Sequence, residues 1–271
     1  MSQHVPPHGD VAAGQEETQR QATGTPVSEE RHTRTRSPIN NGHEDNGAGN
    51  LNNGGGSNAL FKLLEKATDD INAMRDLNPK WNNLKDMVNI HCSDDENKTP
   101  LHLAAQKGFR SVVKKLLDEG AADVSVGDED GWTPLHFACS EGHTEVIDEL
   151  FSHDADPRLT DSFGKNPLHL ASRDGQEAAF NVIFKKYPEL LGKTTKAGIT
   201  PLHFAILYSN EKIVDICLKE GAALDVKDND GWTPLMTAVV FKNKDTMDKL
   251  IQLLKKRGGI RAFNASRRPR Q

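Results

Sequence analysis

The chain has 271 residues, of which 35 % are hydrophobic and 27 % charged, with a formal net charge of −5 and three cysteines. Soluble domains average roughly 45–50 % apolar residues when glycine is counted, so part of this chain is expected not to pack. Three unclustered cysteines exclude a disulfide scaffold and favour a reducing compartment, and the sequence has no apolar run of the length that a membrane helix or a signal peptide requires.

Residues 1–57 predict a disordered leader. They contain four arginines, no lysine, seven acidic residues and no aromatic residue, and they are rich in Gly, Asn, Ser and Thr. Such a segment cannot bury enough apolar surface to offset the conformational entropy of its backbone.

Residues 58–93 predict helices. An apolar face at helical spacing is formed by Leu60, Phe61, Leu63 and Leu64, and the pattern resumes at Trp81 after Pro79 interrupts it. The segment is interpreted as a helical N-terminal cap or a degenerate repeat, with a separate helical hairpin as the alternative.

A tetrapeptide recurs after this segment at spacings of 34, 33, 34 and 33 residues. Its copies begin at Thr99, Thr133, Asn166, Thr200 and Thr233, and four of the five read Thr/Asn-Pro-Leu-His. The residue before the proline can cap a helix, and proline suits the first helical position. The period and the motif resemble the ankyrin repeat, in five copies over residues 94–257. The resemblance implies an all-α solenoid of helix-turn-helix units with β-hairpin-like connecting loops, flanked by disordered termini.

The ends of the predicted first helices follow the same period. Gly108, Gly142 and Gly175 supply the left-handed residue that ends a short helix, whereas Ser209 and Lys242 take this place in repeats four and five. In repeat three the second predicted helix is one residue longer and has no glycine stop near Tyr187, so a distorted junction is expected there.

Charge is divided unevenly along the chain. The leader carries −3 and residues 255–271 carry +7, which leaves −9 on residues 58–254. An acidic body argues against direct binding of nucleic acid. Residues 258–271 are expected to form a basic disordered tail, and a bipartite nuclear import signal is predicted from Lys255, Lys256, Arg267, Arg268 and Arg270. The predicted location is therefore cytoplasmic, nuclear or both.

The sequence offers no recognisable catalytic arrangement. It has no G-x-S-x-G motif, no C-x-x-C pair and no nucleophile–base spacing. The resemblance implies that His102, His136, His169 and His203 are structural, and Cys139 and Cys217 align with packing positions. We therefore expect no catalytic, cofactor or metal site and no small-molecule substrate; an enzyme remains the least favoured alternative.

The resemblance implies that hairpin tips and the ends of the first helices form a concave inner surface that docks another protein. The positions carried over to this surface are Glu129, Asp130, Trp132, Phe163, Lys165, Ile199, Leu207, Tyr208, Trp232 and Phe241. They are acidic toward the N-terminus and apolar toward the C-terminus, which favours a partner with an apolar anchor and flanking basic residues. Two alternatives are that each Trp lies flat over its own hairpin, and that Val240 and Phe241 fold inward.

The predicted function is therefore a non-catalytic scaffold, adaptor or inhibitor. The alternative within the same fold is a nuclear regulator that masks a transcription factor.

Overall fold

The computed structural model describes residues 55–87, 96–119 and 122–266, all within the unit that spans residues 49–271. Nearly all of the predicted leader and the end of the predicted tail, with Arg267, Arg268 and Arg270, lie outside the described residues. The described part is built from helices, and no strand occurs in it. Its α-helices are α2 (Gly55–Lys66), α3 (Asp70–Leu77), α4 (Trp81–Leu84), α5 (Pro100–Lys107), α6 (Arg110–Asp118), α7 (Pro134–Glu141), α8 (Thr144–Ser152), α9 (Pro167–Asp174), α10 (Glu177–Lys186), α11 (Pro201–Leu207), α12 (Glu211–Lys219), α13 (Pro234–Val240) and α14 (Lys244–Ser266).

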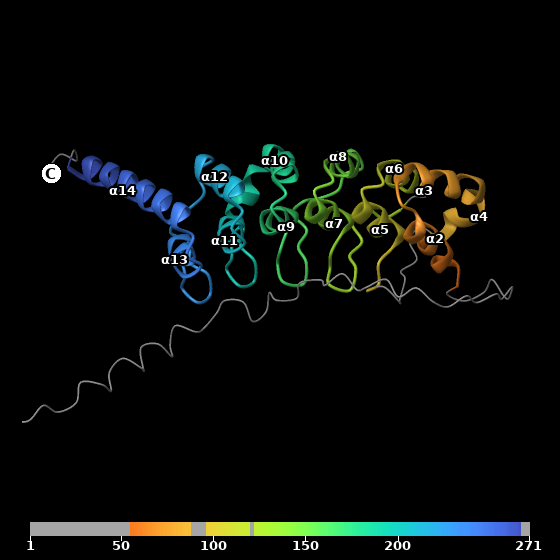
Figure 1. Ribbon diagram of the computed structural model, residues 1–271, viewed down its shortest axis with the longest axis horizontal. Coiled ribbons are helices and arrows are strands. Elements are labelled where there is room, and N and C mark those ends of the chain that lie inside the picture. Colours follow the sequence, from red (N-terminus) through yellow and green to blue (C-terminus); the bar gives the residue numbers. More distant parts are fainter. Residues whose placement is uncertain (1–54, 88–95, 120–121, 267–271) are drawn as a thin grey trace, which may run out of the picture. The chain divides into compact units, whose positions relative to one another are not determined.

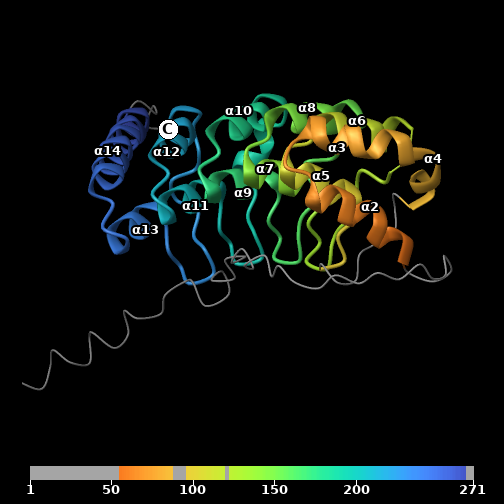
Figure 2. The same cartoon turned by 45° about the vertical axis from the view of Figure 1, so that its right-hand side comes forward.

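The helices stack in two rows (Figure 1). The first helix of each repeat packs on the next first helix, in the order α5, α7, α9, α11 and α13, and this series is the inner row. The second helices α6, α8, α10 and α12 form the outer row, and the connecting loops project beside the inner row (Figure 2). Each repeat thus buries apolar surface against its neighbours, as a repeat that lacks a core of its own requires.

In each of its first four copies the recurring tetrapeptide caps the first helix through its histidine, with Asn166 in place of threonine in the third copy. In the first copy, the backbone N–H and the hydroxyl of Thr99 both donate to His102 Nδ1, at 2.9 and 2.8 Å. This leaves the proton on Nε2, which donates to the carbonyl of Val126 at 2.9 Å in the loop that leads to the next repeat. The histidines thus have the structural role that was predicted. Each one caps its own helix and also forms a hydrogen bond to the following loop.

The first helices of repeats one to three end at glycines, as predicted. Gly108, Gly142 and Gly175 have φ of 75°, 80° and 72°. Ser209 and Lys242 adopt the same left-handed conformation, with φ of 58° and 56°. The period of the fold therefore imposes this backbone geometry even where the residue does not favour it.

The N-terminal helices continue both rows. α2 packs against α5 in the inner row and α3 against α6 in the outer row. Two polar side chains connect them to repeat one: Lys107 donates to the carbonyls at the end of α2, and Asp70 accepts the N–H groups of Ser111 and Val112 at the start of α6. α2 and α3 thus stack on the two helices of repeat one.

Two further departures from a regular repeat are present. α10 has ten residues, one more than α6, α8 or α12, and is followed by a 3₁₀ turn over Pro188–Gly192, which confirms the predicted irregular junction. α14 continues to Ser266, past the boundary predicted at residue 257. Gly258 and Gly259 lie inside this helix, and each glycine destabilises a helix interior by about 1 kcal/mol without interrupting it. A proline would break the helix, but the first proline after Lys244 is Pro269.

Candidate functional site

The inner surface is formed by the loop tips and by the ends of the first helices. Backbone hydrogen bonds connect neighbouring tips: Glu129 N–H donates to Glu96 O, Ser162 N–H to Asp130 O, and Lys196 N–H to Phe163 O, at 3.0, 2.8 and 2.9 Å. Because each tip is bonded to the next, the tips form one continuous edge. Side chains from different repeats can therefore act on the same bound segment.

The side chain directly before each capping residue was predicted to face a partner. In repeats two to four it is buried instead. Trp132, Lys165 and Ile199 are buried, with 7 %, 6 % and 4 % of their surface exposed. The prediction that these three side chains are presented to a partner is wrong, because the chain itself covers them. Trp232, at the same position of the last repeat, is half-buried.

Trp132 shows the physical reason. Its ring packs on Phe137 of its own repeat with centroids 5.2 Å apart, and the guanidinium of Arg173 from the next repeat lies 5.5 Å above it. Trp132 thus packs against the first helix of its own repeat and is covered by the next repeat. Arg173 is in turn held by a bidentate ion pair to Asp174, whose carboxylate also accepts from Ser140 Oγ at 2.6 Å.

An apolar patch is left at the ends of α11 and α13. We define it as Leu207, Tyr208, Val240 and Phe241, which occupy equivalent positions in two first helices that pack together. Tyr208 is 37 % exposed and Val240 is 48 % exposed, while Leu207 and Phe241 are half-buried. Val240 therefore does not fold inward. Tyr208 stacks on Phe204, with 6.3 Å between the ring centroids, so its ring is supported from beneath.

Acidic side chains occupy the same edge toward the N-terminus. Glu129 and Asp130 form the exposed tip of repeat two. Phe163 at the next tip is half-buried, and the Lys165 ammonium lies 4.7 Å from the centre of its ring. The acidic tip thus belongs to repeat two and the apolar patch to repeats four and five, with repeat three between them.

The last repeat exposes two apolar side chains that sequence reasoning missed. Met236 is 51 % and Val239 53 % exposed, whereas the equivalent His203 and Ile206 of repeat four are almost fully buried. In the described part of the chain no further repeat covers α13. The sequence signal was the methionine itself, which stands where the other copies have a histidine that bonds to the next loop.

The histidines of the recurring motif and the cysteine of α12 are buried in the packed interior of the repeats. Burial lowers the pKa of His136 and of His169 to about 4, which keeps both rings neutral. Burial raises the pKa of the Cys217 thiol to about 12, so it is a poor nucleophile. Within the described residues no group of three or more His, Cys, Asp or Glu side chains could hold a metal ion.

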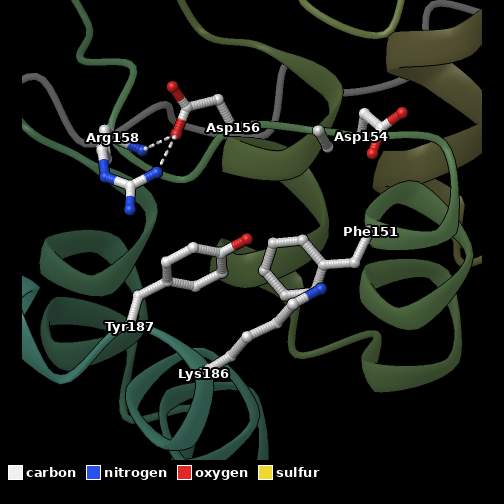
Figure 3. A pocket seen from close by; sticks show the side chains of 7 residues that line it. Phe151, Asp154, Asp156, Arg158, Lys186 and Tyr187 are labelled. Carbon is white, nitrogen blue, oxygen red and sulfur yellow. Dashed lines mark hydrogen bonds and ion pairs between the residues drawn. The ribbon is translucent and has the colours of Figure 1, made fainter.

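A pocket of about 230 Å³ lies in the outer row, where the irregular junction of repeat three meets repeat two (Figure 3). Its rings, Phe151 and Tyr187, have centroids 5.5 Å apart. Lys186 lies 4.4 Å from the centre of the Phe151 ring and Arg158 lies 5.0 Å from that of Tyr187. The chain's own cations thus already occupy positions over these rings that a cationic ligand would use.

No described helix is both long enough and apolar enough to cross a bilayer. A sequence model of the family described as "Ankyrin repeats (3 copies)" matches residues 46–161, 121–191 and 168–260.

Curated proteins similar to this chain include the human protein named "Inhibitor of Bruton tyrosine kinase", 36 % identical over 97 residues, which are 33 % of this chain and 7 % of that protein. Human palmitoyltransferase ZDHHC13 is 33 % identical over 192 residues, covering 67 % of this chain and 30 % of that protein. Human Rabankyrin-5 is 30 % identical over 114 residues, covering 38 % of this chain and 10 % of that protein. The chain thus spans less than a third of the length of each of these relatives.

Proposed function

Because the chain belongs to the ankyrin-repeat family, whose sequence model matches it between residues 46 and 260, we propose that it is a non-catalytic platform for one segment of another protein. Ankyrin repeats are protein-interaction modules, and this much the family membership establishes. The relatives carry different names, an inhibitor of a tyrosine kinase and a palmitoyltransferase among them. What they have in common with this chain supports a shared binding role, as a scaffold, adaptor or inhibitor, rather than a shared reaction.

The observation that carries the proposal is the apolar patch on the inner surface. Two of the five large hydrophobic side chains that are exposed in the described residues, Tyr208 and Val240, belong to this patch. Exposed apolar clusters mark interfaces, and tyrosine is enriched among the residues that dominate binding energy. The partner segment is expected to place an apolar side chain on the patch and basic side chains at the acidic tips of Glu129 and Asp130.

The experiment is site-specific photo-crosslinking in cells with the full chain. A photoreactive phenylalanine analogue is introduced at Tyr208, within the patch, and at Ile71 of α3 as the matched control. Ile71 is the most exposed large hydrophobic residue described, at 81 %, and it lies outside the patch. The proposal expects discrete adducts from position 208 that are absent from position 71.

A second variant tests the apolar contact itself. Val240→Asp places a carboxylate in the patch, at a position 48 % exposed, so the fold is expected to tolerate it. Loss of the position-208 adducts in this variant, with unchanged helical circular dichroism, is the supporting result. Adducts that appear equally at positions 208 and 71 would contradict the proposal.

As an alternative, we propose that the chain is a nuclear regulator that masks a transcription factor. Lys255 and Lys256 are exposed on α14, which supports recognition by the import machinery. Replacing both lysines by alanine in the fluorescently tagged full chain is expected to shift it from the nucleus to the cytoplasm. An unchanged distribution would remove this alternative.

A further inference from the structure

The last pair of outer-row helices differs from the earlier pairs. α6 packs on α8 and α8 on α10 along the row, whereas α14 packs mainly on α13. α12 and α14 are neighbours at the end of the row (Figure 2), and a pocket of about 430 Å³ lies between them. We refer to it as the α12–α14 pocket.

The floor of the α12–α14 pocket is apolar and its rim is basic. Leu218 of α12, 9 % exposed, and the half-buried Leu253 of α14 form the floor. The rim consists of Asp215, Lys219, Lys249, Gln252 and Lys256. An apolar floor with a mainly basic rim is suited to an acidic segment that carries an apolar side chain.

The balance of charge on the rim is positive even after its ion pairs are counted. Asp215 is the one acidic residue of the lining. It forms an ion pair with Lys249 between the two helices, so these two charges neutralise each other. Lys219 lies 3.8 Å from Glu220 with 83 % of its side chain exposed, so water screens that pair strongly. Lys256 has no ion-pair partner among the described residues.

We propose that the α12–α14 pocket binds an acidic segment of a partner protein that carries a leucine-sized apolar side chain. The apolar side chain lies between Leu218 and Leu253, and carboxylates beside it pair with Lys256 and Lys219. This surface is separate from the inner surface and has the opposite charge preference. The chain therefore offers two docking surfaces, one for a basic segment and one for an acidic segment.

A peptide is a better match to these observations than nucleic acid. Three rim lysines would supply a few phosphate contacts, but the buried leucine floor has no partner on a phosphate backbone.

The test uses a fluorescent peptide in which two leucines are flanked by glutamates, titrated into the full chain while its anisotropy is followed. One control peptide has serines in place of the leucines, and a second has lysines in place of the glutamates. The proposal expects saturable binding of the glutamate–leucine peptide alone, weakened by salt because exposed charges contribute to it.

A pair of neighbouring lysines gives a matched control in the protein. Lys256 lines the α12–α14 pocket, whereas the adjacent Lys255, which is also exposed, does not. Lys256→Glu is expected to weaken peptide binding by about tenfold, while Lys255→Glu, with the same change in net charge, is expected to change it by less than about twofold. Circular dichroism confirms that both variants remain folded.

Four results would overturn the proposal. They are equal weakening by the two variants, equal binding of the serine peptide, no binding of the glutamate–leucine peptide at millimolar protein, and tighter binding of single-stranded oligothymidine than of that peptide. Tighter binding of a peptide spanning residues 1–54 would also overturn it, because the occupant would then be the leader of the chain itself. None of these results depends on whether the inner surface binds its own partner.

Discussion

At the scale of single residues, the signature histidine is the most informative side chain. His136 accepts from the backbone and hydroxyl of Thr133 through Nδ1 and bonds to Lys165 O through Nε2 at 3.1 Å. Such a bonding pattern requires the neutral ring with its proton on Nε2. The repeat therefore depends on histidine at a position where a metal ligand or a general base would look identical in the sequence.

The buried histidines predict loss of stability in mild acid. The pKa of His136 and of His169 is about 4 in the folded chain and 6.5 when exposed, so below pH 6.5 the unfolded state binds more protons. The free energy of unfolding should fall by about 1.4 kcal/mol per pH unit for each of these histidines down to pH 4. Burial lowers the pKa of His203 as well, which adds to the same trend.

Urea denaturation at several values between pH 7 and pH 5 measures this slope. His153 acts in the opposite sense, because bonds to Glu149 O and Asp118 raise its pKa. Its contribution is present in acid and is lost as the pH rises through its folded pKa, so it offsets part of the loss. A free energy of unfolding that stays constant from pH 7 to pH 5 would contradict the assignment of buried neutral rings.

The burial of Trp132 predicts a stability effect for its substitution. Because the side chain is 7 % exposed and contacts Phe137 and Arg173, Trp132→Ala should destabilise the fold by about 3–5 kcal/mol. Thermal denaturation measures the loss. Tyr208→Ala is the comparison, since a 37 % exposed ring should cost clearly less. Equal melting temperatures for the two variants would show that Trp132 is not part of the core.

At the scale of helices, the caps and turns were predictable from sequence, whereas the exposed surface was predictable only in part. Thr99, Pro100 and Gly108 act on backbone within their own helix, so local chemistry sets both of its ends. The burial of Trp132 depends on Arg173, which is far along the chain and reaches it only because repeats stack. The apolar patch could be predicted because it lies at helix ends, which the next repeat leaves partly uncovered.

The left-handed serine of repeat four predicts a stabilising substitution. Ser209 has φ of 58°, a conformation that costs a residue with a Cβ about 1 kcal/mol and costs glycine nothing. Ser209→Gly should therefore raise the free energy of unfolding by about 0.5–1 kcal/mol, after allowance for the greater entropy of unfolded glycine. Chemical denaturation measures the change.

The reverse substitution in repeat three is the control. Gly175 has φ of 72°, and a Cβ there would lie 2.8 Å from Asn210 Oδ1. Gly175→Ala is expected to destabilise the chain, because alanine disfavours the left-handed backbone conformation and because its Cβ would clash with Asn210. A decrease in stability for Ser209→Gly would show that the serine side chain contributes more than the backbone strain costs.

At the scale of the whole stack, stability is expected to depend on the contacts between neighbouring repeats. In such a one-dimensional array, each interface adds a nearest-neighbour term, and a weak interface allows its two sides to unfold separately. Glu149 of α8 is a buried contact of this kind, 5 % exposed, and it pairs with Arg110 and Lys114 of α6 at 3.2 and 3.4 Å.

Glu149→Gln removes the charge from this contact while keeping its shape. Arg110 and Lys114 are more than half exposed and can turn to water, so the interface should lose about 1 kcal/mol rather than the several that a stranded buried charge would cost. In a background with Trp132 and Trp232 replaced by phenylalanine, Trp81, buried in α4, is the single tryptophan and reports unfolding on the N-terminal side of this interface, while far-ultraviolet circular dichroism reports all helices. In the variant the urea midpoint of Trp81 fluorescence should fall below that of the circular dichroism signal, whereas the two coincide when Glu149 is kept. Coincident midpoints in both proteins would mean that this ion pair does not couple the two ends of the stack.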